Sequence, residues 1–120
     1  MNTQELIENF SFLDNWEDKY RYIIELGEKL KSFDNAFKTD EYKVEGCQSQ
    51  VWLKQQEDDS YIADSDALIV KGLLYIVLII YNENKNADIN DIFTQTGLLE
   101  HLSPSRRNGL FAVIEKIKYS

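Results

Sequence analysis

The stretch "ALIVKGLLYIVLIIY", Ala67 to Tyr81, decides how this chain folds. Many of its side chains are β-branched and would suit a buried strand. They are Ile69, Val70, Ile76, Val77, Ile79 and Ile80. A strand rarely exceeds about ten residues, so the length of the run favours a helix. Asp64, Ser65 and Asp66, directly upstream, offer a helix cap and favourable first-turn charge. We therefore predict a buried helix over Ala67–Tyr81.

Further helices are predicted on both sides of this run. Thr3–Leu30 shows helical periodicity in two pieces, with Asp14 or Asn15 as the cap of the second piece. After the polar loop 82–88, a short helix is predicted over Ile89–Thr96. A last helix is predicted from Pro104 to about Lys118, capped by Ser103. Its buried positions are Leu110, Val113, Ile114 and Ile117.

The segment between the second and third helices alternates as strands do. Strands are predicted in "YKVEG" (42–46) and "SQVWLKQQ" (49–56), with a short third one in "DDSYIADSD" (58–66). Asp58, Asp59 and Ser60 form the expected hairpin turn. The sequence thus predicts one α+β domain over residues 1–120, with helices packed on a small antiparallel sheet.

Composition restricts the class of partner. Hydrophobic residues make up 43% and charged residues 28% of the chain, as in an ordinary globular protein. The net charge of -8 argues against nucleic acid and an anionic membrane surface as partners. It fits a basic patch on a partner protein, or simply keeps the chain in solution. The apolar run is also interrupted by Lys71 and Gly72, too early for a membrane span.

The chain contains a single cysteine, Cys47, within "VEGCQSQVWL". It cannot form an internal disulfide, and the first residues lack a secretory signal pattern, so we expect a cytoplasmic location. Gly46 permits a sharp turn before the cysteine, and Gln48, Ser49 and Gln50 surround it with hydrogen-bonding groups. Two interpretations remain open from these residues: an inert packing thiol, or a reactive thiol on a loop.

Several kinds of chemistry fit the sequence poorly. A cysteine protease needs a histidine base, and His101 is the only histidine. A zinc or Fe–S site needs three or four Cys or His ligands. A rhodanese-type loop would place an arginine and glycines after the cysteine. Arg106 and Arg107 oppose the dipole of the last helix, and two interpretations stay open: they hold a carboxylate or an anionic sulfur species, or they are two solvated surface side chains.

Four motifs together resemble the SufE-like sulfur-acceptor family, including its CsdE branch. They are "WEDKYRYIIELGEKL", "VEGCQSQVWL", "ADSDALIVKGLL" and "HLSPSRRNGL", in that order, and the resemblance runs from about Glu5 to Ile117. It implies helices on a three-stranded antiparallel sheet of the SufE/IscU type. It also implies a persulfide carrier and activator for a cysteine desulfurase (SufS-like) that passes sulfur to an Fe–S assembly scaffold (SufB-like).

The resemblance also assigns roles to residues. Cys47 would accept the sulfur, Arg106 would stabilise its thiolate or persulfide, and Asp66 would lie near the loop and the desulfurase surface. Gly46, Gln48 and Ser49 would contribute to partner binding. No cofactor or metal is expected on this chain beyond the transient persulfide, because pyridoxal phosphate belongs to the desulfurase. Cys47 is expected to be partly buried in the free protein and to swing out on partner binding.

Three alternatives stay open beside the carrier. The chain could regulate the desulfurase through its surface alone, or deliver sulfur to another pathway. An IscU-like cluster scaffold is the third, and the absence of further ligand cysteines argues against it.

Overall fold

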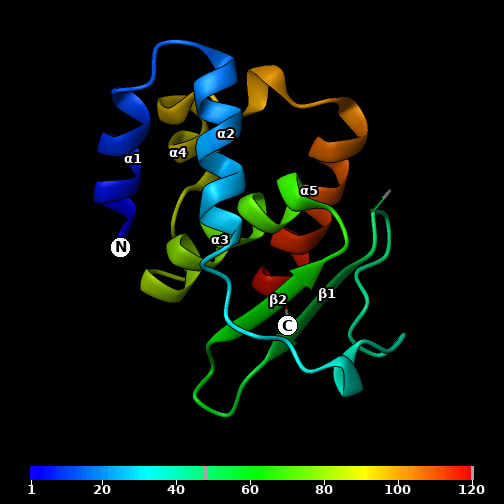
Figure 1. The fold of residues 1–120 in the computed structure, drawn as a ribbon. Helices are drawn as coiled ribbons and strands as arrows, with labels where there is room; N and C mark the ends of the chain where they lie inside the picture. The colour runs from blue at the N-terminus through cyan, green and yellow to red at the C-terminus, as the bar shows by residue number, and fades with distance from the viewer. Residues whose placement is uncertain (48, 120) are drawn as a thin grey trace.

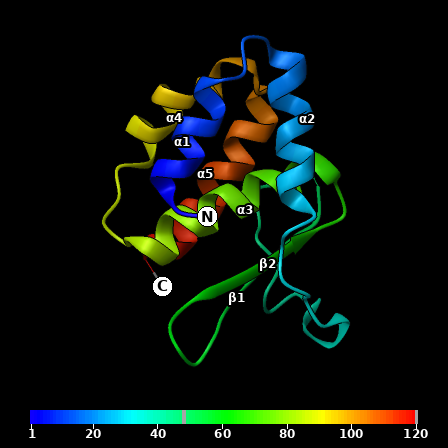
Figure 2. The same cartoon turned by 60° about the vertical axis from the view of Figure 1, so that its left-hand side comes forward.

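The computed structural model describes residues 1–47 and 49–119. Its elements, in chain order, are α1 (Thr3–Ser11), α2 (Trp16–Gly27), η1 (Asn35–Phe37), β1 (Val51–Gln55), β2 (Tyr61–Ser65), α3 (Leu68–Glu83), α4 (Ile89–Thr96), η2 (Leu99–His101) and α5 (Pro104–Lys118). The other helices gather on one side of α3, and the β1–β2 hairpin extends from its other side (Figures 1 and 2). The predicted α+β class is therefore confirmed.

The central helix is α3, in the run that was predicted to be a buried helix. Its side chains form much of the core, and the buried ones include Ile69, Leu73, Leu74, Ile76, Val77, Ile80 and Tyr81. Helix α2 crosses it in backbone contact at Gly72, where a Cβ atom would lie 1.9 Å from the carbonyl oxygen of Ile23. Only a glycine fits at this crossing, because any side chain would separate the two helices.

The predicted cap of α3 is wrong. The helix begins after Ala67, whose side chain makes no capping hydrogen bond, while Asp64 and Ser65 belong to β2. The hydroxyl of Ser65 accepts a hydrogen bond from the amide of Ala67 at 3.3 Å, one residue before the helix starts. The side chains of Asp64 and Asp66 have other partners, described below. The side chains of Asp64 and Asp66 therefore bind partners in other parts of the fold and do not cap α3.

The remaining helix ends follow local rules. Asn15, rather than Asp14, caps α2 by accepting from the amide of Asp18 at 2.9 Å. Helix α2 ends at Gly27, short of the predicted end. Ser103 caps α5 as predicted, with its hydroxyl accepting from the amide of Arg106 at 3.3 Å. The four positions predicted to be buried on α5 are buried.

The sheet is a two-stranded antiparallel hairpin among the described residues, with Val51 opposite Ser65 and Gln55 opposite Tyr61. Its turn is the predicted one. The carboxylate of Asp58 accepts from the amide and hydroxyl of Ser60, and Asp59 has a φ of 70°, in the left-handed region.

The first of the three predicted strands, over residues 42–46, is wrong, while the other two are present as β1 and β2. This segment touches β1 at a single bridge, Lys43 with Trp52, flanked by a hydrogen bond of 2.8 Å from the amide of Val44 to the carbonyl of Val51. The pairing is short because the amide of Lys43 still donates to Thr39 in a preceding turn, and because Gly46 turns the chain away with a φ of 87°. We call residues 34–43 the strap, since they run along the outer side of β1.

Candidate functional site

The loop that carries Cys47 lies between the strap and β1, and both of its stems are held by the sheet. The amide of Val44 donates to the carbonyl of Val51 at the base. On the β1 side, the carbonyl of Gln50 accepts from the hydroxyl of Ser65 at 2.7 Å and from the amide of Asp66 at 3.3 Å. The amide of Gln50 donates to the carboxylate of Asp66 at 3.1 Å. Among the described residues, Glu45, Gly46, Cys47 and Ser49 lie between these bonds and form the tip of the loop.

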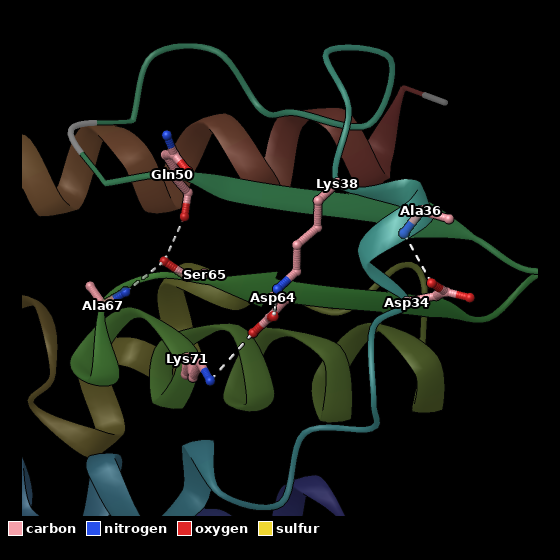
Figure 3. Close-up of polar contacts among 8 residues, drawn as sticks. All are labelled: Asp34, Ala36, Lys38, Gln50, Asp64, Ser65, Ala67 and Lys71. Carbon is pink, nitrogen blue, oxygen red and sulfur yellow. Dashed lines mark hydrogen bonds and ion pairs between the residues drawn. The ribbon is translucent and has the colours of Figure 1, made fainter.

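Figure 3 shows part of this arrangement, with the carbonyl of Gln50 directed at Ser65 and the hydroxyl of Ser65 linked in turn to Ala67. The predicted position of Asp66 near the cysteine loop is therefore found, with a defined contact to Gln50. Asp66 is otherwise exposed.

Cys47 is directed inward, against α5. Its Sγ lies 3.5 Å from the carbonyl oxygen of Gly109, within reach of a weak thiol hydrogen bond. A Cβ atom at position 109 would lie 3.3 Å from the same sulfur, so the glycine leaves the space that the thiol occupies. The side chain is half-buried, as expected for the free protein.

The thiol opens into a small pocket of about 50 Å³ between the loop, α3 and α5. Its wall is mainly aliphatic, with Val51, Val70, Leu73, Leu74, Leu110 and Val113. Its polar members are Ser49, Ser105 and Arg106. A water-sized group needs about 10–15 Å³ of such space, so one additional sulfur atom on Cys47 fits inside.

Arg106 lines this pocket from the first turn of α5. Its Nη1 atom is buried and has no hydrogen-bond partner among residues 1–47 and 49–119. Buried donors are normally paired, so this atom is suited to an acceptor that enters the pocket. The neighbouring Arg107 differs, because its Nε donates to the carbonyl of Leu102 at 3.2 Å. The structure thus places Arg106 at the pocket and gives Arg107 a different partner.

The closed position of the loop disfavours ionisation of Cys47. Burial and the nearby carboxylate of Glu45 both raise the pKa of Cys47 above its ordinary value. The thiolate, which is the nucleophilic form, is therefore disfavoured while the loop is closed.

The structure brings Cys47, Ser49 and Arg106 together around one pocket. Gly46 is exposed and supplies the left-handed turn before the cysteine. Gln48, predicted to contact a partner, lies outside the described residues. Sequence reasoning missed Ser105 and Gly109, which also line the pocket; Gly109 follows Arg106 by three residues, about one turn of α5. Helical spacing from Arg106 to Gly109 was the available signal.

His101, the candidate base for protease chemistry, lies elsewhere. Its ring stacks on Trp16 with the centroids 4.6 Å apart, and it is not among the residues that line the Cys47 pocket. Among residues 1–47 and 49–119, no group of three His, Cys, Asp or Glu side chains is placed to hold a metal ion. None of the helices in that same part of the chain has the length and apolarity needed to cross a membrane.

Fold and site together define a small α+β protein with one half-buried thiol on a loop. Comparison with known proteins places the chain in a family. The SufE domain, an Fe-S metabolism associated domain, matches residues 4–120. The chain belongs to the SufE-like family.

Two relatives are uncharacterised SufE-like proteins. The one from Rhizobium meliloti (strain 1021) is 45% identical over 126 residues, covering 95% of this chain and 90% of the relative. The one from Rhizobium etli is 42% identical over 126 residues, covering 95% of this chain and 85% of the relative.

Proposed function

We propose that this protein accepts sulfur from a cysteine desulfurase onto Cys47, stimulates that enzyme, and passes the sulfur to an Fe–S assembly scaffold. The observation that carries the proposal is the pocket beside Cys47, which combines an aliphatic wall with the buried, unpartnered Nη1 atom of Arg106. Family membership, with its link to Fe-S metabolism, points the same way.

The transfer is an exchange between a thiol and a persulfide. The Cys47 thiolate attacks the outer sulfur of the persulfide on the desulfurase, and a new S–S bond forms. The S–S bond of the donor breaks, and the donor cysteine leaves as a thiolate that takes up a proton equivalent to the one Cys47 lost. Sulfur moves without net oxidation, so no outside oxidant is needed. A second thiol nearby would discharge the persulfide as a disulfide, and this chain has none.

The closed loop explains how the carrier avoids side reactions. In the free protein the pKa of Cys47 is raised, and its sulfur faces α5 rather than solvent. Partner binding would draw the tip outward about Gly46, whose φ of 87° already lies in the left-handed region. After transfer, the terminal sulfur would return to the pocket, where Arg106 would balance its negative charge.

The partners follow from this chemistry. A SufS-like desulfurase holds the pyridoxal phosphate and forms the first persulfide, and a SufB-like scaffold complex takes the product. Delivery to a different pathway, as in the CsdE branch, uses the same step on Cys47. A reducing compartment such as the cytoplasm suits a carrier with one free thiol.

Intact-mass spectrometry tests the proposal. The protein is mixed with a cysteine desulfurase, pyridoxal phosphate and cysteine. The expected result is a gain of one sulfur mass that reductant reverses and that Cys47→Ser abolishes. No gain, with desulfurase turnover still stimulated by Cys47→Ser, would instead support a regulatory module that acts through its surface.

Arg106 is tested against its neighbour in the same helix turn. Arg106→Met should slow sulfur uptake by roughly tenfold, the effect of one lost charge-assisted hydrogen bond. Arg107→Met removes the same charge outside the pocket and should leave the uptake rate within about twofold of wild type. Equal rates for the two variants would contradict the role given to Arg106.

A further inference from the structure

Three consecutive residues at the end of β2 bind the segments that precede and follow the Cys47 loop. Ser65 and Asp66 hold the C-terminal stem through the backbone of Gln50, as described above. Asp64, which precedes them, holds the strap, and the strap leads into the N-terminal stem. Figure 3 shows the two contacts side by side, with Gln50 over Ser65 and Lys38 reaching from the strap to Asp64.

Asp64 lies between two ammonium groups from different parts of the fold. Its Oδ2 atom is 2.9 Å from Nζ of Lys38 in the strap, and its Oδ1 atom is 3.6 Å from Nζ of Lys71 on α3. The side chain of Asp64 is only 16% exposed, and that of Lys38 28%. Such a partly shielded pair interacts more strongly than one on an open surface.

The contact to Lys38 is one of several that fasten the strap to the sheet, since Nζ of Lys54 on β1 also lies 4.8 Å from the ring centroid of Phe37 and 5.9 Å from that of Tyr42. Backbone pairing with β1 is limited to the bridge at Lys43 and its neighbouring hydrogen bonds. Lys38 also lies over the ring of Trp52, with Nζ 5.3 Å from the ring centroid. Its ammonium group therefore joins the strap to both strands of the hairpin at once.

The strap is linked to the cysteine by a short path. The carbonyl of Tyr42 accepts from the amide of Leu53 at 2.9 Å, and the amide of Val44 donates to Val51 at 2.8 Å. Three residues after Val44 comes Cys47, seated against Gly109. These two bonds join the strap to β1 directly before the loop, so a strap displaced from the hairpin would lose them.

We infer that Lys38 and Asp64 are positioning residues for Cys47: their ion pair holds the strap on the hairpin and thereby keeps the thiol in its pocket. The inference rests on the proposed function, since it names the device that keeps the sulfur-accepting thiol closed. Lys71 is not a positioning residue in this inference. It binds the same carboxylate from α3, which carries no part of the loop.

The test measures how fast iodoacetamide alkylates Cys47 in the free protein, where it is the only thiol. Lys38→Met should raise the rate roughly fivefold, the change expected when the closed loop loses one partly buried ion pair. Lys71→Met removes an equal charge from the same carboxylate and should leave the rate unchanged. Lys38→Arg keeps the ion pair and should restore the wild-type rate.

Two further readouts separate positioning from general loss of stability. Hydrogen exchange at the amide of Val44 should accelerate in Lys38→Met and stay protected in Lys71→Met. Thermal unfolding of both variants shows whether each remains folded at the temperature of the assay. A wild-type alkylation rate in folded Lys38→Met would overturn the inference, as would equal increases in the two methionine variants. If Lys38→Met fails to fold, Lys38→Gln takes its place in the same comparison.

This experiment fails independently of the proposed function, because alkylation needs no desulfurase. If wild-type protein takes up no sulfur, the carrier proposal is lost while the alkylation rates still decide the role of Lys38. If sulfur uptake occurs and the alkylation rates do not differ, only the inference about the ion pair is lost.

Discussion

Replacing Gly109 with alanine should expose Cys47 without weakening the fold. A Cβ atom at this position would lie 3.3 Å from Sγ of Cys47 and 3.5 Å from its Cα. The second distance is an ordinary contact, and the first requires the sulfur to give way by a few tenths of an ångström. The sulfur can move because its loop is held at the stems and free at the tip.

Two opposing effects set the magnitude. Alanine is favoured over glycine in a helix interior by about 1 kcal/mol, and position 109 lies inside α5. The opposing effect is the tight contact between the new Cβ atom and Sγ of Cys47, which the loop relieves by shifting outward. The free energy of unfolding should therefore stay constant or rise by up to about 1 kcal/mol, which corresponds to at most about 4 °C in Tm. The alkylation rate of Cys47 should rise, because its sulfur loses the contact with the carbonyl of residue 109.

Circular dichroism gives the Tm, and timed alkylation gives the reactivity. Asn108→Ala is the matched control, since Asn108 is an exposed neighbour on the same helix and does not line the pocket. It should match the Tm gain and leave the alkylation rate as it was. A fall of several degrees in Gly109→Ala with unchanged alkylation would mean that the loop is rigid, and the reasoning above would be refuted.

Three other predictions concern the fold and its response to pH. Gly72→Ala should lower the free energy of unfolding by about 3 kcal/mol or more in a urea titration, because the new Cβ would lie 1.9 Å from the Ile23 carbonyl; a loss under about 1 kcal/mol would contradict the backbone contact. Asp59→Gly should raise the free energy of unfolding by up to about 1 kcal/mol in the same titration, since a φ of 70° strains any side chain. A fall in the free energy of unfolding would show that the side chain of Asp59 stabilises the turn. Because burial and Glu45 raise the pKa of Cys47 in the folded state, its contribution to stability is complete below about pH 8.5 and is lost as the pH rises through the folded pKa. Stability curves should thus show a steeper decline above pH 8.5 for wild type than for Cys47→Ala, and parallel curves would exclude this effect.

Much of the fold was predictable because local signals and burial agreed. The apolar run of α3 is longer than a strand, so its helical state followed from length, despite many β-branched residues. The caps at Asn15 and Ser103 also followed from residue type. The hairpin turn needed no glycine, because Asp58 satisfied the turn with its own carboxylate.

The errors arose where tertiary contacts overruled local patterns. Residues 42–46 alternate like a strand, yet the turn at Thr39 and the left-handed Gly46 leave room for one bridge only. Asp64 and Asp66 look like a helix cap, yet one binds Lys38 and the other binds Gln50. Nothing in the local sequence records these distant partners.

Some residues of the candidate site were also predictable from the sequence, and others were not. Cys47 stood out as the single cysteine after a glycine, and family resemblance singled out Arg106 over Arg107 before the structure distinguished them. The aliphatic wall and the role of Gly109 could not be read from spacing alone. They depend on how α3 and α5 meet beneath the loop, and this packing exists only in the folded chain.

The closed base of the loop makes its tip a replaceable unit. Val44 and Val51 are joined by a backbone hydrogen bond, and Gln50 is held through its main-chain atoms, so the backbone closes the base of the loop. Loop-closure entropy grows slowly, by about 0.6 kcal/mol for each doubling of length. A longer arm could therefore be grafted between these two valines at little cost, so that the thiol reaches further from the hairpin.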